Sequence, residues 1–114
     1  MKTWKTPATT VSEVLQRAFQ VFGRYGKHWN NYTIRDGAKD TVCSLGAIGV
    51  AASGGNATSI NGRLARRAIT LVKKHAGTID NIDNIPSWND SQKSFTPIKN
   101  AFCGALKEAL KKDI

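Results

Sequence analysis

Five basic residues between positions 63 and 74 have the type and spacing to bind a polyanion. They are Arg63, Arg66, Arg67, Lys73 and Lys74. At 100° per residue, Arg63, Arg67 and Lys74 fall within about 40° of one line along a helix of about 16 Å, and the other two lie beside it. No acidic residue interrupts this sequence, and guanidinium groups bind phosphate in a bidentate manner. The pattern predicts a cationic helix face, with a merely solvated surface as the equally weighted alternative.

Further contacts to the same partner are predicted at Lys27, Trp29 and Arg35. An aromatic ring among cations can stack on the bases of a single strand. Such rings more often anchor a core or a loop, so stacking is the less favoured of the two interpretations.

The residues that catalysis or metal binding would need do not form a recognisable pattern. His28, Cys43, His75 and Cys103 are metal-ligand types, but no two have the close spacing of zinc sites. No Ser–His–Asp or Cys–His arrangement and no phosphate-binding glycine motif can be placed. We therefore expect a protein that is not an enzyme and has no cofactor and no metal. His75, on the apolar side of its helix, is predicted to be a core histidine.

Size and composition are those of one globular domain. The chain has 114 residues, of which 40% are hydrophobic and 22% charged, and a formal net charge of +9. Such a charge favours polyanions such as DNA, RNA or acidic proteins. The longest nearly apolar stretch, residues 45–52, is far shorter than a membrane span, and the first residues lack the apolar core of a signal peptide. We expect a cytoplasmic protein that has no contact with a membrane. The two cysteines are expected to be buried thiols, although a disulfide between them stays open.

The elements that carry these residues are mainly helical. Thr10 and Glu13 form a capping box that begins a helix over residues 11–25. A helix of small residues is expected over 44–52, and a third from about Thr58 or Ser59 to Ala76. The last helix begins with Thr96 as its N-cap and has an apolar stripe from Ile98 to Leu110, with Lys111 and Lys112 near its C-terminus.

Two segments are predicted to be irregular or only weakly structured. Asp36 and Gly37 indicate a turn, which predicts a short β-hairpin near residues 32–42 or a loop in its place. Residues 80–94 are interpreted as a connection anchored in the core by Ile79, Ile82 and Ile85. With residues 1–9 as an irregular lead-in, the chain is predicted to be a mainly α, single small domain (1–114) of about four helices.

Two short motifs have a structural explanation before any functional one. In Cys43-Ser44-Leu45-Gly46-Ala47, small residues at a helix start favour close approach of a neighbour. In Trp88-Asn89-Asp90, the indole is expected to fill the core while the two polar side chains hold a turn. The residues that carry these motifs are Cys43, Leu45, Gly46, Trp88, Asn89 and Asp90.

Together, these motifs resemble a family of small uncharacterised bacterial and phage proteins. Its members have a Cys-x-Leu-Gly-Ala helix start, a Trp-Asn-Asp turn and a final amphipathic helix. The resemblance implies an accessory protein of a phage or mobile element without an established activity. This chain differs from the usual members in being more basic.

The sequence thus favours a small basic accessory protein that binds nucleic acid, either DNA or RNA, through a cationic helix face. If about five phosphates are engaged, the logarithm of the affinity should fall with the logarithm of salt at a slope near about −4.5. The alternative is a protein-interaction module that inhibits or modulates an acidic host protein. Both hypotheses leave the oligomeric state open.

Overall fold

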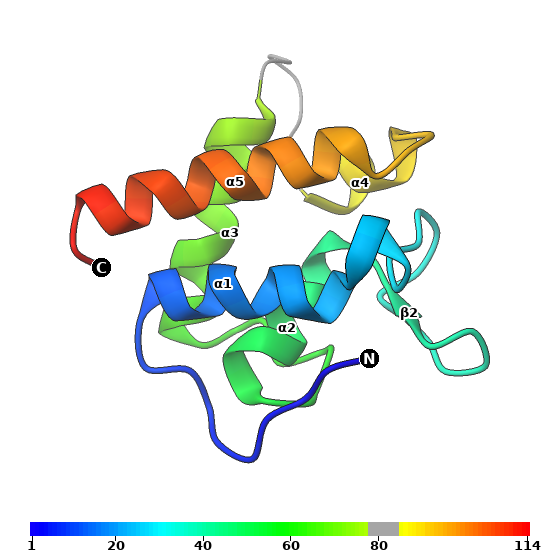
Figure 1. Ribbon diagram of the computed structural model, residues 1–114, viewed down its shortest axis with the longest axis horizontal. Helices are drawn as coiled ribbons and strands as arrows, with labels where there is room; N and C mark the ends of the chain where they lie inside the picture. The colour runs from blue at the N-terminus through cyan, green and yellow to red at the C-terminus, as the bar shows by residue number, and fades with distance from the viewer. Residues whose placement is uncertain (78–84) are drawn as a thin grey trace.

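Five α-helices and one small hairpin make up the part of the chain that the computed structural model describes, residues 1–77 and 85–114. The mainly helical, single-domain architecture confirms the prediction, with one helix more than expected (Figure 1). The elements are α1 (Val11–Phe22), the 3-10 turn η1 (Arg24–Gly26), β1 (Arg35–Asp36), β2 (Thr41–Val42), α2 (Ser44–Ser53), α3 (Arg63–Ala76), α4 (Ile85–Ser91) and α5 (Thr96–Lys111).

Helix α1 begins at the predicted cap. The backbone N–H of Glu13 donates to Thr10 Oγ1 at 3.0 Å. The Glu13 carboxylate accepts from the N–H of Thr9 instead of Thr10, at 2.7 Å. The helix ends at Gly23, whose φ is +73°, so it is three residues shorter than predicted. The next residues form η1, in which Tyr25 has a left-handed φ of +59°.

The predicted hairpin is present but minimal. Strands β1 and β2 pair antiparallel, with Arg35 opposite Val42 and Asp36 opposite Thr41. Asp36 Oδ1 accepts from the N–H groups of Ala38 and Lys39, both at 3.1 Å, which holds the turn.

Helix α2 is buried nearly all round, as its small residues predicted. A Cβ atom at Gly46 would come within 2.0 Å of the Ile34 carbonyl oxygen, and one at Gly49 within 2.2 Å of that of Ala57. Both glycines are therefore required by close backbone approach. The helix ends in a left-handed cap at Gly54.

Helix α3 begins later than the sequence predicted, at Arg63 instead of Thr58 or Ser59. The Asn56 side chain accepts from both the N–H and the hydroxyl of Thr58, at 3.0 and 2.8 Å. Because Thr58 takes part in this turn, it cannot cap a helix. Gly62 is the N-cap residue instead, and it provides no side-chain cap.

Helix α4 was not predicted. It lies inside the stretch interpreted as a connection, and its Ile85 and Trp88 side chains are buried in the core. Ile85 thus confirms one expected anchor, whereas Ile79 and Ile82 lie outside the described residues. Helix α5 begins at Thr96, with Phe95 as the N-cap residue, so Thr96 is not the cap that was predicted.

Helices α1 and α5 lie antiparallel on one face of the molecule, and α3 crosses behind both (Figure 1). Phe22 and Phe102 meet edge to face at 5.1 Å between these helices. Helix α2 closes the core from below α1, with Ile48 and Val50 buried. Among the described helices, none has the length and apolar character that crossing a membrane requires.

Candidate nucleic-acid interface

The outward face of α3 presents three arginines to solvent. Arg63, Arg66 and Arg67 are exposed, while the opposite side of the helix buries Ala65, Ala68, Leu71 and Val72 in the core. Within residues 1–77 and 85–114, no acidic side chain forms an ion pair with these arginines. This half of the predicted cationic face is therefore accessible to a polyanion.

The arginines lie at the end of α3 where helix electrostatics disfavours them. A helix N-terminus carries the positive end of the macrodipole and favours acidic residues by about 0.3–1 kcal/mol each. The first turn of α3 has no acidic residue and no side-chain cap. By contrast, α1 begins with a capping hydroxyl and Glu13. Basic residues at the start of α3 therefore do not serve the stability of that helix.

The C-terminal half of the same face is neutralised by α5. Glu108 accepts from Lys74 at 2.9 Å and from Lys112 at 2.7 Å. Hydrogen bonds from Lys112, Lys74 and His75 lower the pKa of Glu108 to about 2. Lys74 is therefore not the free cation that the sequence suggested. Lys73 is only partly exposed.

His75 is not a core residue, which corrects the sequence-based expectation. Its Nε2 lies 2.8 Å from Glu108 Oε1, and the side chain is 29% exposed. A Cβ atom at Gly104 would come within 2.5 Å of His75 Nδ1. The imidazole therefore packs against α5 at the surface, because α5 brings a glycine and a carboxylate to this end of α3.

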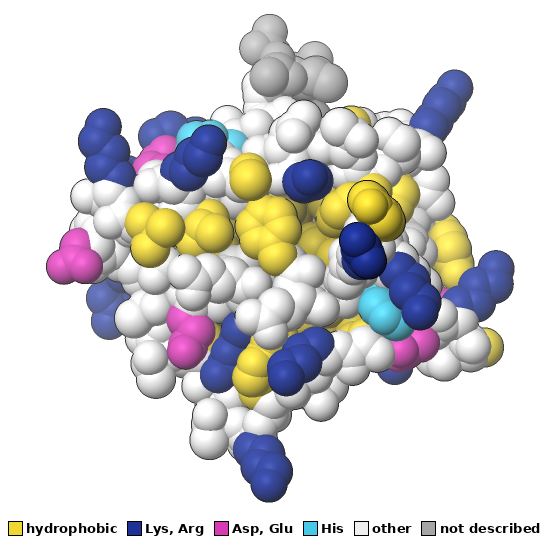
Figure 2. Space-filling view, viewed as in Figure 1, with side chains coloured by type: hydrophobic (Ala, Val, Ile, Leu, Met, Phe, Trp, Pro, Cys, Tyr) yellow, Lys and Arg dark blue, Asp and Glu magenta, His cyan; other side chains and the backbone are white. Residues whose placement is uncertain are grey.

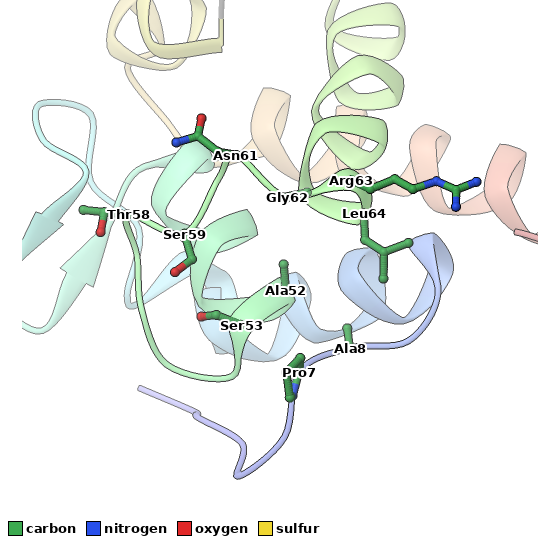
Figure 3. Close-up of a pocket in the computed structure, with 11 residues that line it drawn as sticks. Pro7, Ala8, Ala52, Ser53, Thr58, Ser59, Asn61, Gly62, Arg63 and Leu64 are labelled. Carbon is green, nitrogen blue, oxygen red and sulfur yellow. The ribbon is translucent and has the colours of Figure 1, made fainter.

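A pocket of about 580 Å³ adjoins the arginine face at the start of α3. It lies between Pro7 and Ala8, the end of α2 and the loop of residues 58–62. Figure 3 shows the Arg63 side chain extending away from the Ser53 and Ser59 hydroxyls. Ser53 Oγ donates to the Gly49 carbonyl of α2 at 2.8 Å and accepts from the N–H of Asn56 in the following loop, also at 2.8 Å. Apart from Arg63, no residue that lines the pocket is charged, so the pocket does not extend the cationic surface.

The predicted accessory residues have different environments. Lys27 is exposed, and Arg35 pairs with Asp40 at 3.0 Å. Trp29 is partly buried, donates from Nε1 to Asn89 Oδ1 at 2.8 Å and packs near Phe95. Since its polar edge and its ring are both engaged in the fold, Trp29 is an anchor, and base stacking by this residue is not supported.

The two sequence motifs meet in one buried hydrogen-bond network. Asn89 is fully buried, and its Oδ1 accepts from Ser44 N at 2.9 Å, from Ser44 Oγ at 2.6 Å and from Trp29 Nε1. Its Nδ2 donates to the Asn30 carbonyl at 3.1 Å and to Asp90 at 3.0 Å. Asn89 lies in α4 and links distant segments, so it does not hold a local turn as the sequence suggested. No local signal in the sequence could reveal this role.

The other motif residues are also accounted for by packing. Trp88 is 4% exposed, which confirms that it fills the core. Leu45 packs at the edge of the core, and Gly46 allows the close approach described above. Cys43 and Cys103 are both free thiols; Cys43 is buried as expected, which raises its pKa, whereas Cys103 is only partly buried. Among the described residues, no three His, Cys, Asp or Glu side chains cluster as a metal site would require.

Comparison with known proteins gives one family. The model of a family of unknown function (DUF6197) matches residues 6–101. This match confirms the expectation that the chain belongs to an uncharacterised family. No curated protein and no solved structure matches the chain.

Proposed function

The chain belongs to this family of unknown function, and we propose that it is a small non-enzymatic accessory protein that binds nucleic acid through the outward face of α3. The observation that supports this proposal most is the placement of Arg63, Arg66 and Arg67. All three are exposed and have no ion-pair partner among the described residues, and Arg63 and Arg66 lie in the first turn of the helix, where its dipole disfavours cations. Residues that break a local stability rule without compensation are expected at functional sites.

The mechanism is neutralisation of phosphates with little reading of base sequence. Guanidinium groups on one helix face can contact successive phosphates and release their counterions. With the three free arginines engaged, the slope of log affinity against log salt should be about −2.7 for duplex DNA. It would approach about −4.5 only if Lys73 and Lys74 also leave their intramolecular contacts.

The direct test is charge reversal on α3. We expect Arg63→Glu with Arg67→Glu to abolish binding of labelled duplex DNA and RNA, measured by fluorescence anisotropy between about 50 and about 200 mM salt. The melting temperature should stay the same or rise, because the new carboxylates complement the helix dipole.

A matched control exists on α5. Lys107→Glu with Lys111→Glu reverses two exposed cations at the same i,i+4 spacing and changes the net charge equally. This variant should keep most of the binding. Equal loss in both double variants would mean that binding follows total charge and has no site on α3, which would contradict the proposal.

A second experiment uses the acid that neutralises Lys74. Glu108→Gln removes that partner, so it should strengthen DNA binding and steepen the salt slope by up to about 0.9. Glu13→Gln is the charge-matched control on α1, where the carboxylate lies near Arg17 and not near α3. An equal effect of both variants would show that Lys74 has no part in binding.

The second candidate function, binding of an acidic host protein through the same arginines, predicts a different result. A partner captured from host lysate would then survive nuclease treatment and would be lost in the α3 double variant. Loss of the captured material on nuclease treatment supports the nucleic-acid proposal.

A further inference from the structure

A second surface, on the opposite side of the molecule from α3, is mainly hydrophobic (Figures 1 and 2). Figure 2 shows a band of hydrophobic side chains along the junction of α1 and α5, with cationic side chains beside it. The band includes a pocket of about 480 Å³ between Phe19, Phe95 and the η1 turn. This α1–α5 groove is not used by the function proposed above.

Helical geometry extends the groove beyond the pocket. Taking 100° per residue, Phe95, Lys99, Leu106 and Leu110 lie on one side of α5, next to Phe102, which contacts Phe19 and Phe22 of α1. From Phe95 to Leu110 this side is about 22 Å long. Leu110 is 53% exposed, and Leu106 is only partly buried. The apolar strip is therefore about as long as four turns of a helix lying along it.

Tyr25 stands at one end of the groove as an unusual residue. It lines the pocket, is 85% exposed and has a left-handed φ of +59°. A non-glycine residue in this conformation is strained, and here the side chain gains no burial in return, only the Arg24 guanidinium 5.4 Å from its ring centroid. Neighbouring hydrogen bonds maintain the turn, including His28 N to the Phe22 carbonyl at 2.8 Å. The turn thus presents an aromatic ring to solvent at a structural cost, a feature typical of binding surfaces.

The charge of the residues that line the groove indicates which kind of ligand it binds. Arg24 and Lys99 line the pocket, and no acidic residue does. A second copy of this chain, with its net charge of +9, would be repelled by these cations, whereas an acidic ligand would be attracted.

We propose that the α1–α5 groove is a docking site for an acidic amphipathic helix of a partner protein. The apolar side chains of that helix, at i, i+3 or i+4, i+7 and i+11, pack along Phe19, Phe95, Leu106 and Leu110. Tyr25 closes one end of the groove, and carboxylates at the helix edge pair with Arg24 and Lys99. This site is independent of nucleic-acid binding by α3.

The probe for the test is a synthetic labelled peptide of about four helical turns, with leucines on one face and glutamates elsewhere. A second peptide has the same composition in an order that breaks the apolar stripe. We expect saturable anisotropy for the first peptide and at least about tenfold weaker binding for the second. Amide chemical shifts should change at Phe95, Lys99 and Leu106 and not along α3. Equal binding of both peptides, or shifts confined to α3, would overturn the proposal.

Substitutions at two lining residues test whether the peptide binds in the α1–α5 groove. Tyr25→Asn removes the ring while keeping a residue that tolerates left-handed backbone, and Lys99→Glu reverses the lining charge. Each should weaken the peptide about tenfold. The controls Tyr32→Asn, at another exposed tyrosine, and Lys5→Glu should change the affinity less than twofold. Light scattering that shows a dimer sensitive to Tyr25→Asn would assign the groove to a second copy and refute the proposal, as would displacement of the peptide by single-stranded DNA.

Discussion

At the scale of single residues, the side-chain amide of Asn89 links the two sequence motifs by hydrogen bonds. Asn89 uses its oxygen and both N–H donors, and it joins the start of α2, the Trp29 indole and the backbone at Asn30. These segments are far apart in the sequence, with Ser44 lying 45 positions from Asn89. Both sequence motifs are therefore parts of one structural unit, and their presence does not indicate a ligand site.

Replacing Asn89 by alanine should strongly destabilise the fold. The change leaves Ser44 N, the Trp29 Nε1–H and the Asn30 carbonyl without their partner, and unsatisfied buried groups cost about 1–3 kcal/mol each. We expect a loss of at least about 3 kcal/mol in the free energy of unfolding, measured by urea denaturation. Asn100→Ala, at an exposed position of α5, should be nearly neutral. A loss below about 0.5 kcal/mol for Asn89→Ala would contradict this role.

At the scale of elements, α2 shows how a poor helix sequence becomes the centre of a bundle. Glycine costs about 1 kcal/mol relative to alanine inside a helix. Gly46 and Gly49 nevertheless occupy α2, because backbone carbonyls of Ile34 and Ala57 lie against them. Close packing of the chain around α2 takes precedence over helix propensity.

Gly49→Ala should therefore destabilise the protein although it raises helix propensity. Its Cβ would meet the Ala57 carbonyl at 2.2 Å, so the loop must shift, at a cost of about 1–3 kcal/mol. Gly55→Ala is the matched control, since its nearest contact would be Thr3 Cγ2 at 4.0 Å. Thermal unfolding of both variants is the measurement. A stabilised Gly49→Ala protein would show that the close approach is absent.

The contact between α3 and α5 should make stability depend on acid. Lys112, Lys74 and His75 hold the pKa of Glu108 at about 2, below its ordinary value of about 4.3. The ionised form is thus favoured by folding, so its contribution is complete above about pH 4.5 and is lost as the pH falls toward 2.

Glu108→Gln should remove this pH-dependent contribution. The difference in unfolding free energy between wild type and variant should be constant above about pH 4.5 and shrink below it. An NMR titration of the Glu108 carboxyl checks the same point directly. A midpoint near about 4.3 would mean that the three-cation contact does not persist in solution.

At the scale of the whole molecule, exposed cations lie both on α3 and beside the α1–α5 groove. Helix α3 crosses behind α1 and α5, whereas the α1–α5 groove lies on the near face (Figures 1 and 2). Duplex DNA and the acidic helical peptide should consequently bind at the same time. The α3 double variant should lose DNA and keep the peptide within about twofold, and the Tyr25 and Lys99 variants should do the reverse. Sedimentation of the ternary mixture tests this, and mutual displacement of the two ligands would contradict it.

Local chemistry determined much of this protein from the sequence alone. Thr10, Glu13 and Gly54 are helix-end signals, and the apolar stripe of α5 is a periodic one. Such signals act between residues three or four positions apart, so they can be recognised without a fold. The cationic face of α3 was found in the same way, and its arginine half is exposed as the periodicity predicts.

The tertiary structure alone decided which of these side chains stay free. Lys74, His75 and Trp29 were assigned from their own helix or loop, yet their environments come from Glu108 and Asn89, more than 30 positions away. Likewise, α4 has only seven residues, too few for a periodic signal, and packing of Ile85 and Trp88 stabilises it. A side chain's character follows from its type and local spacing, but its partner is selected by contacts that exist only once distant segments have packed together.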